Sequence, residues 1–279
     1  GMDTVFWYHR NGLSAMQAKS MNPIPPQALE TALEAARAAS VPILARYHGD
    51  FDIEIKADQT PVTIADREAD TVVREVLQAA FPDHGIYGEE FGTDQPEAEY
   101  LWLVDPIDGT KSFVRGTGMF STQIALMRDG DILLGVSNAP AMDELAWAAR
   151  GEGAWLNGER IAVSDTKSIE ATHLSVGNLV TLARSPRWQK LGDLVARVNR
   201  LRGYGDFYHY HRLAAGQLDA VLESDVNILD IAALSVIVEE AGGVFTDLEG
   251  KAPDLATTSV LAAPPALHAE LLSAMRESS

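Results

Sequence analysis

Residues 100–110 read Tyr-Leu-Trp-Leu-Val-Asp-Pro-Ile-Asp-Gly-Thr, an apolar run that leads into two aspartates around a proline. The run over 101–104 predicts a short buried strand that ends at the first aspartate, and Pro106 fixes a tight bend after it. Such a bend presents the carboxylates of Asp105 and Asp108 and a main-chain carbonyl around one point. Hard cations such as Mg²⁺ bind oxygen ligands of this kind, together with water and substrate phosphate. The stretch therefore favours a magnesium site at the end of a strand.

Two other interpretations of the same stretch carry less weight. Asp108-Gly109 could be an ordinary polar turn, but carboxylates crowded this closely repel one another unless a cation lies between them. Haloacid-dehalogenase-type phosphatases also have Asp, Gly and Thr near a strand end, but as Asp-x-Asp with the first Asp as nucleophile. Here the spacing is Asp-x-x-Asp, so we reject that covalent mechanism.

Three further acidic positions lie at the ends of predicted elements. Asp66 begins a helix predicted over 65–80, Glu89 follows a short strand, and Asp230 begins a helix predicted over 230–241. Each also has a purely structural interpretation, because Asp66 and Asp230 could cap their helices and Glu89 could lie on a solvated edge.

The composition excludes several classes of function. The chain has 279 residues, 22 Lys and Arg against 40 Asp and Glu, a net charge of −18 and no cysteine. The absence of cysteine excludes disulfides, thiolate metal sites and cysteine nucleophiles. The negative charge disfavours binding to nucleic acid or to anionic lipid, because phosphate contacts need Lys and Arg. An anionic substrate would therefore need cations in its site.

The N-terminus and the hydropathy pattern predict a cytoplasmic protein. No apolar run approaches the roughly 20 residues of a membrane helix, so we expect no membrane partner. Residues 1–22 lack the apolar segment of a signal peptide, and Gly1 before Met2 is typical of a residue left by tag cleavage. We treat 1–22 as a leader that is not necessarily native.

Mixed helical and strand patterns indicate an α/β (α+β) chain of two parts, 23–152 and 153–279, with sheets covered by helices. The helices are expected over 27–46, 65–80, 186–199, 208–216, 230–241 and 266–275, with Pro42 kinking or interrupting the first. The strands are expected over 53–55, 100–104, 120–128, 132–138, 174–176, 201–204, 218–223, 243–246 and 260–263.

From about residue 27 to the C-terminus, the chain resembles the inositol monophosphatase family. The resemblance rests on Gly88-Glu-Glu90, on 102–110, on Leu229-Asp-Ile-Ala-Ala233 and on Glu240-Ala-Gly-Gly243, in that order. It implies a layered αβαβα sandwich of the inositol monophosphatase and fructose-1,6-bisphosphatase type. It also implies Mg²⁺-dependent hydrolysis of a phosphomonoester, with two or three ions per site and often a homodimer.

The resemblance also implies a ligand set. Glu89, Asp105 and the Ile107 carbonyl would hold a first metal ion, and Asp105, Asp108 and Asp230 a second. Two such ions can stabilise both the attacking and the leaving oxygen of an in-line displacement.

Other positions would bind or orient the reactants. By resemblance, Asp66 would hydrogen-bond Thr110, and this pair would orient the attacking water. The Gly109 and Thr110 amides would point at the phosphate if they open a helix or turn. Lys56 aligns loosely with a loop that closes over metal and phosphate. The family usually has Trp where this chain has Leu229, which changes a packing partner but removes no ligand.

The substrate is predicted from two more acids. Glu223 ends a predicted strand, where the family places an acid near the non-phosphate end of the substrate, although it could also be a solvated strand-end residue. Arg202-Gly-Tyr-Gly-Asp206-Phe-Tyr resembles the histidinol-phosphate phosphatase branch, as do Tyr87-Gly-Glu-Glu-Phe91 and 111–116. Asp206 and Glu223 would suit an ammonium and an imidazole, so we expect L-histidinol-phosphate phosphatase activity, as in histidine biosynthesis.

Alternatives of the same and of another class remain. The chain could be an inositol-1-monophosphatase or another small sugar or polyol phosphatase, or a non-catalytic sugar-phosphate-binding regulator. The intact Asp66 and Thr110 argue against a regulator, which has no need to position water. His209 and His211 could suggest zinc, but they fall in a predicted helix, and we expect them to pack in the core or on the surface.

Overall fold

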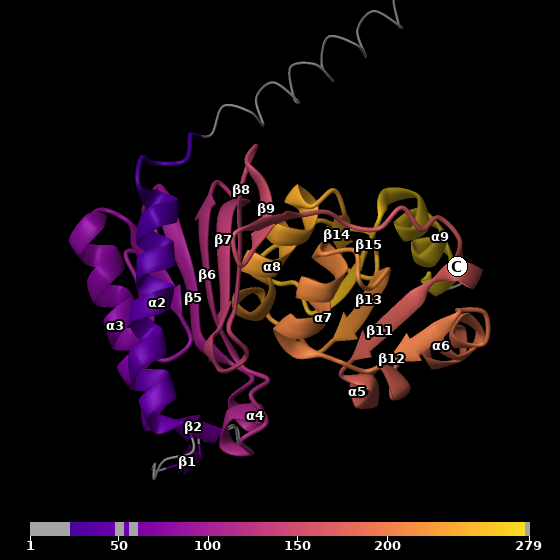
Figure 1. Cartoon of the computed structure of the whole chain (residues 1–279), viewed down its shortest axis with the longest axis horizontal. Helices are drawn as coiled ribbons and strands as arrows, with labels where there is room; N and C mark the ends of the chain where they lie inside the picture. The colour runs from indigo at the N-terminus through magenta and orange to yellow at the C-terminus, as the bar shows by residue number, and fades with distance from the viewer. Residues whose placement is uncertain (1–22, 48–52, 56–60, 277–279) are drawn as a thin grey trace, which may run out of the picture.

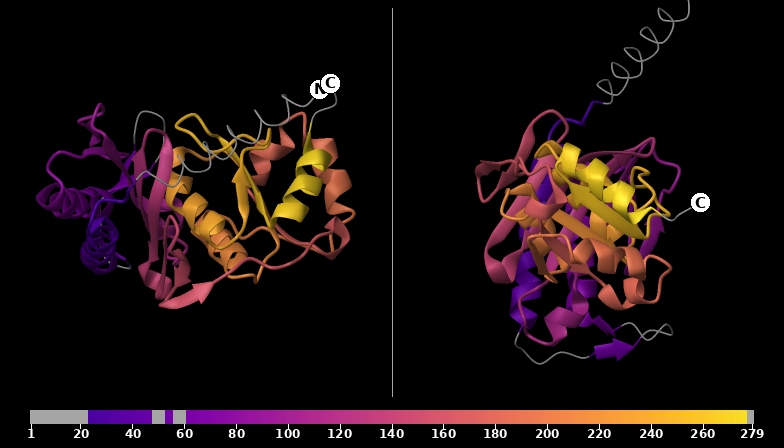
Figure 2. Two further views of the ribbon diagram at one scale, coloured as in Figure 1. Left: turned by 90° about the horizontal axis from the view of Figure 1, so that it is seen from above. Right: turned by 90° about the vertical axis from the view of Figure 1, so that its right-hand side faces the viewer.

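The structure is a computed structural model that describes residues 23–47, 53–55 and 61–276; the predicted leader and Lys56 lie outside these residues. Its layers alternate helix, sheet, helix, sheet and helix, which confirms the expected αβαβα sandwich (Figures 1 and 2). The helices of these layers are α2 (Ala28–Arg46) with α3 (Ile64–Ala80), α7 (Asp206–Ala214) with α8 (Ile228–Glu240), and α6 (Trp188–Val195) with α9 (Pro265–Met275). In the described part of the chain, no helix combines the length and apolar character needed to cross a bilayer.

The first sheet has eight strands in the order β10-β9-β8-β7-β6-β5-β3-β4. They are β3 (Gly85–Gly88), β4 (Gly92–Asp94), β5 (Tyr100–Asp108), β6 (Ser121–Arg128), β7 (Asp131–Ala139), β8 (Glu144–Ala149), β9 (Gly153–Leu156) and β10 (Glu159–Ile161). The predicted hairpin over 120–138 is confirmed as β6 and β7. A separate pair joins β1 (Ile53–Ile55) to β2 (Pro61–Thr63).

The eight-stranded sheet continues past the division predicted at 152/153. Strands β9 and β10 follow that position and still pair within this sheet, which ends at Ile161. The change from one sheet to the other therefore falls after Ile161, in the segment before β11 (His173–Gly177).

Helices α2 and α3 cover one face of this sheet, and α2 buries mainly small side chains. The buried positions of α2 are mostly alanines, which allow close packing against α3 and β7. Although Pro42 cannot donate a backbone hydrogen bond, α2 continues through it to Arg46, and Ile43 beyond it is buried. The predicted interruption at Pro42 therefore does not occur.

The second sheet has five strands in the order β12-β11-β13-β15-β14. Besides β11 they are β12 (Arg200–Arg202), β13 (Ala220–Ser224), β14 (Val244–Thr246) and β15 (Ser259–Ala263). Strand β11 is parallel to β12 and β13, with Gly177 beside Glu223. The short helix α5 (Leu179–Ala183) follows β11 and was not predicted, and the helix predicted over 186–199 is shorter.

Helix α8 lies between the two sheets and is apolar nearly all round, as expected for a helix buried on both sides. It packs closely on β7, because a Cβ atom at Gly135 would lie only 2.6 Å from the Ala233 Cα atom. It also contacts β5, and Asp230 in its first turn lies beside Asp105 and Asp108 near the end of that strand.

Strand β5 does not end at Val104 as predicted but continues to Asp108. Asp105 pairs with Gln123 and Asp108 pairs with Ser121, so β5 has one extra residue between these pairs. Two residues three apart on a regular strand face opposite sides, whereas the β-bulge turns both aspartates toward the same cavity.

Candidate active site

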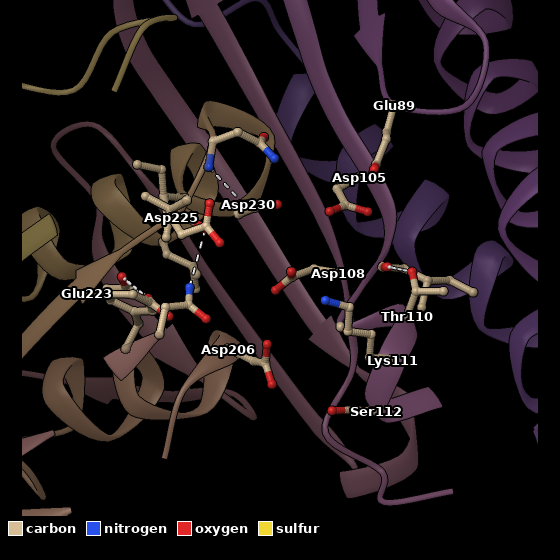
Figure 3. Close-up of a pocket in the computed structure, with 18 residues that line it drawn as sticks. Glu89, Asp105, Asp108, Thr110, Lys111, Ser112, Asp206, Glu223, Asp225 and Asp230 are labelled. Carbon is tan, nitrogen blue, oxygen red and sulfur yellow. Dashed lines mark hydrogen bonds between the residues drawn. The ribbon is translucent and has the colours of Figure 1, made fainter. Parts of the chain in front are cut away.

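An open cavity of about 480 Å³ lies between the two sheets, where chain segments from both parts of the molecule meet (Figure 3). The acidic residues that line it are Glu89, Asp105, Asp108, Asp206, Glu223, Asp225 and Asp230. Figure 3 shows Glu89, Asp105 and Asp108 on one wall, with Asp206 and Glu223 across the cavity from them. This excess of negative charge requires cations if the cavity is to accept a phosphate.

Three of these carboxylates form a tight cluster. One oxygen from each of Asp105, Asp108 and Asp230 lies within 4.8 Å of the others. Burial raises the pKa of Asp105 well above its usual range, and the negative charges of Asp108 and Glu89 raise it further. Burial likewise raises the pKa of Asp108, with Asp230 as the next cause. The cluster is therefore costly to ionise without a cation.

The donor set fits a hard divalent cation. Asp105 is 2% exposed, and its Oδ1 atom is buried without a hydrogen-bond partner among the described residues. A buried carboxylate oxygen of this kind is a strong cost unless a ligand satisfies it. The cavity offers carboxylates and the backbone of Ile107, and no cysteine exists in the chain. All-oxygen donors suit Mg²⁺ better than zinc or copper.

Asp230 is held by the start of its own helix. The Asn227 side chain accepts a hydrogen bond from the Leu229 amide at 2.8 Å, and Asp230 Oδ2 accepts one from the Asn227 amide at 2.9 Å. This capping box fixes the carboxylate at the end of α8. Burial raises the pKa of Asp230 to about 6, and the Asn227 hydrogen bond opposes that shift. Asp230 thus completes the cap, and its carboxylate also lines the cavity.

Thr110 begins the short helix α4 (Thr110–Val114) directly after Gly109, which has a φ of 87°. A residue with a Cβ atom is disfavoured at Gly109, because that φ is left-handed and the Cβ would lie 2.6 Å from the Met119 carbonyl oxygen. The Thr110 hydroxyl donates to Asp66 Oδ2 at 3.3 Å and to the Ile107 carbonyl at 3.0 Å. The structure thus brings together Asp66 and Thr110, which are 44 positions apart.

Glu223 lies at the far wall and is 5% exposed. Its Oε2 atom lies 3.0 Å from His209 Nε2 and accepts a hydrogen bond from the Tyr210 hydroxyl at 2.5 Å. Asp206 begins α7 with a φ of 48°, an uncommon conformation that occurs at functional sites. Burial raises the pKa of Asp206 to about 6, with the charge of Glu223 as a second cause.

The structure gathers most of the predicted site residues and adds others. Glu89, Asp105, Ile107, Asp108, Gly109, Thr110, Asp206, Glu223 and Asp230 line the cavity, and Asp66 reaches it through Thr110. Lys56 lies outside the described residues. The sequence analysis missed Lys111, Ser112, Asn178, Tyr210 and Asp225, which also line the cavity.

Local sequence offered little sign of these residues. Asn178 follows β11 with a φ of 51°, and its amide donates to the Ser224 carbonyl at 2.6 Å. An Asn directly after a strand-ending Gly is a turn signal, which could have marked this corner. Tyr210 lies inside a predicted helix, and nothing in that pattern indicates its bond to Glu223.

As for His209 and His211, both are fully buried in α7, which confirms that they pack in the core. His211 lies 2.9 Å from Glu144 Oε2 and 2.8 Å from Ser137 Oγ, away from the aspartate cluster.

The chain is similar to known proteins over nearly its full length. The model described as "Inositol monophosphatase family" matches residues 26–279. The histidinol-phosphatase of Mycobacterium tuberculosis is 40% identical over 228 residues, which cover 80% of this chain and 87% of that protein. The histidinol-phosphatase of Chlorobaculum parvum is 35% identical over 249 residues, covering 88% and 96%. The solved structure of an inositol monophosphatase from Anabaena has 30% identity and a TM-score of 0.77, over 88% of this chain and 94% of that one.

Proposed function

Since the chain belongs to the inositol monophosphatase family and is a phosphoric monoester hydrolase, we propose that it cleaves L-histidinol phosphate into L-histidinol and inorganic phosphate. This reaction is a step of histidine biosynthesis in our proposal. Two relatives of this chain bear the name histidinol-phosphatase, which supports the choice of substrate.

One observation carries this proposal. Asp206 and Glu223 line the cavity across from the aspartate cluster, so the site has acids at both ends (Figure 3). The acids of the cluster suit metal ions that receive the phosphate. The acids of the far wall suit a positively charged alcohol, and histidinol carries an ammonium and an imidazole. Inositol carries no positive charge and would gain less from them.

We propose Mg²⁺ as the cofactor, with two or three ions per site. Glu89, Asp105 and the Ile107 carbonyl would hold one ion, and Asp105, Asp108 and Asp230 another. The buried, unpartnered Asp105 Oδ1 atom supports this set. When bound, Mg²⁺ supplies charge neutralisation, a lowered pKa for water and stabilisation of the departing oxygen.

The residues around the cluster orient the reactants. Asp66 accepts a hydrogen bond from the Thr110 hydroxyl, which leaves the lone pairs of the Thr110 oxygen free to accept a hydrogen bond from the attacking water. The amides of Gly109 and Thr110, at the start of α4, would bind the phosphate oxygens. The water oxygen bonds to phosphorus, the bond from phosphorus to the histidinol oxygen breaks, and the proton that the water gives up ends on the departing oxygen, so that histidinol leaves as an alcohol. Lys56 as a further substrate contact stays a prediction.

A second candidate has its own support. The similar Anabaena structure is named an inositol monophosphatase, and the Glu223 carboxylate could also accept hydrogen bonds from hydroxyls. The hydrolysis step would be unchanged. The homodimer and the cytoplasmic location also belong to the proposal, and light scattering on the purified protein would test the homodimer.

Phosphate release from L-histidinol phosphate and from inositol 1-phosphate tests the proposal. Both esters are assayed with saturating Mg²⁺ and with EDTA. We expect turnover of histidinol phosphate that EDTA abolishes. Preference for the inositol ester would overturn the substrate and retain the enzyme class. Phosphate ester binding without release of phosphate from any ester would favour a non-catalytic regulator.

A further inference from the structure

The two oxygens of Glu223 have different surroundings. Oε2 interacts with both His209 and Tyr210, from adjacent positions on α7. Among the described residues, no hydrogen bond to Oε1 is found, and Glu223 lines the cavity. The protein therefore satisfies one oxygen and leaves the other for a ligand.

His209 is fully buried, and its Nε2 atom contacts the Oε2 atom of Glu223. The Tyr204 amide donates to Ser175 Oγ at 3.1 Å, and the same oxygen lies 3.1 Å from His209 Nδ1. On the other side of the ring, Nε2 lies 3.0 Å from Glu223 Oε2, and a proton on Nε2 would be donated to that carboxylate oxygen. Ser175 thus holds the His209 ring in the orientation that places Nε2 against the Glu223 carboxylate.

The same serine binds the segment that precedes the other acid of the far wall. Tyr204, whose amide Ser175 binds, is two residues before Asp206, which begins α7 in its uncommon conformation. Ser175 on β11 therefore connects the segment before Asp206 with the histidine that holds Glu223. His209 itself is not among the described residues that line the cavity.

Gly177 leaves the space that this arrangement needs. Gly177 and Glu223 are partners in the parallel pair of β11 and β13. A Cβ atom at Gly177 would lie 2.3 Å from Glu223 Oε1, so an alanine there would displace the carboxylate. Gly177 is not among the positive-φ glycines, so its backbone conformation tolerates alanine and the effect would be steric.

We propose that Ser175 and His209 are positioning residues that fix Glu223, with Oε1 presented to a cationic group of the substrate, and that they align the segment leading to Asp206. This inference rests on the proposed function, because the cation is the ammonium or imidazolium of histidinol. Neither residue touches the phosphate end. Their removal should weaken recognition of the alcohol and leave the phosphate site intact.

The two reaction products separate these ends of the site. The inhibition constant for L-histidinol measures binding at the far wall, and the inhibition constant for inorganic phosphate measures binding at the metal end. In His209→Asn, which lacks the donor to Glu223, we expect the inhibition constant for L-histidinol and the KM for L-histidinol phosphate to rise roughly tenfold or more. The inhibition constant for phosphate and kcat should change less than about threefold. His209→Gln, whose amide can approach the Nε2 position, should recover part of the loss.

His211→Asn is the matched control, since His211 lies on the same helix and is equally buried but contacts Glu144 and Ser137. It should leave the ratio of the two inhibition constants unchanged. Gly177→Ala would displace Glu223 from the neighbouring strand β11. It should therefore raise the inhibition constant for L-histidinol as His209→Asn does. If circular dichroism shows that His209→Asn does not fold, Ser175→Ala and Tyr210→Phe take its place, because both keep the shape of the site.

The outcomes separate the inference from the proposed function. A wild-type protein that ignores both L-histidinol and its phosphate ester would overturn the proposed function and this inference with it. A wild-type protein that binds both, together with a His209→Asn variant that loses phosphate and histidinol binding equally or loses neither, would overturn the positioning role alone. Selective loss of histidinol binding in His209→Asn and Gly177→Ala, but not in His211→Asn, would support it.

Discussion

The Thr110 hydroxyl lies between two acceptors, 3.3 Å from Asp66 Oδ2 and 3.0 Å from the Ile107 carbonyl oxygen. A hydroxyl has one proton, so these acceptors hold it on the protein side and orient the oxygen toward the cavity. In Thr110→Ala we expect kcat to fall roughly a hundredfold or more, with a smaller change in KM. Thr110→Ser should retain much of the rate. Steady-state kinetics check both, and an unchanged kcat in Thr110→Ala would contradict the orienting role.

Removing one charge from the aspartate cluster should stabilise the metal-free protein and abolish its activity. Asp105→Asn removes a charge that its neighbours oppose, because burial and the charges of Asp108 and Glu89 raise the Asp105 pKa. We expect this variant to lose turnover and, in EDTA, to melt at a higher temperature than the wild-type protein. Calorimetric titration with Mg²⁺ should show weakened binding. Asp193→Asn is a suitable control, since Asp193 is exposed on α6 and does not line the cavity. Wild-type activity in Asp105→Asn would refute the ligand assignment.

The change in melting temperature on removal of Mg²⁺ should depend on pH. Burial raises the pKa of Asp230 and of Asp206 to about 6, above the unfolded values, so the folded state favours their protonated forms. Their contribution to stability is therefore present at low pH and is lost as pH rises through about 6. Mg²⁺ competes with protons for the cluster and should raise the melting temperature more at about pH 8 than at about pH 5. Thermal melts in Mg²⁺ and in EDTA at both values check this, and an equal gain would contradict it.

Much of the site could be predicted because its ligands follow local patterns. Asp108, the acid after β3 and the acid at the start of α8 lie at element ends, and Asp105 lies three residues before the end of β5. The strand boundary could not be predicted, because the bulge between Asp105 and Asp108 depends on the pairing of β5 with β6. Pro106 is a turn signal in isolation, yet its carbonyl accepts a hydrogen bond from Thr122 Oγ1 at 2.8 Å within the sheet.

The surroundings of Glu223 could not be predicted for a similar reason. Its partners His209 and Tyr210 precede it by 14 and 13 positions, on a helix whose periodicity indicates only burial. Ser175 and Gly177 join them through the parallel pairing of β11 with β13. Such contacts depend on topology, which local patterns do not specify. The same applies to the sheet that continues past 152/153.

The turn that carries Glu89 depends on a buried ion pair. Arg74 donates to Asp70 at 3.0 Å, to Asp94 at 2.7 Å and to the Gly92 carbonyl at 2.8 Å, so it ties α3 to the hairpin of β3 and β4. Arg74→Met leaves Asp70, which is fully buried, without its countercharge. We expect a loss of about 3–5 kcal/mol in the free energy of unfolding. Urea denaturation measures it, and the double variant with Asp70→Asn should recover part of the loss. A change below about 1 kcal/mol in Arg74→Met would contradict this role.

The far wall of the cavity is proposed to select a cationic alcohol. The most direct test is the ratio of kcat/KM for L-histidinol phosphate to that for inositol 1-phosphate, measured in the wild-type protein and in Glu223→Gln. Glu223→Gln removes one charge and keeps the shape of the side chain. It should lower kcat/KM for L-histidinol phosphate roughly tenfold or more and change kcat/KM for inositol 1-phosphate little. We predict a wild-type ratio on the order of a hundred or more, falling by that factor in Glu223→Gln. A wild-type ratio below one, or a ratio that Glu223→Gln leaves unchanged, would contradict this role of the far wall.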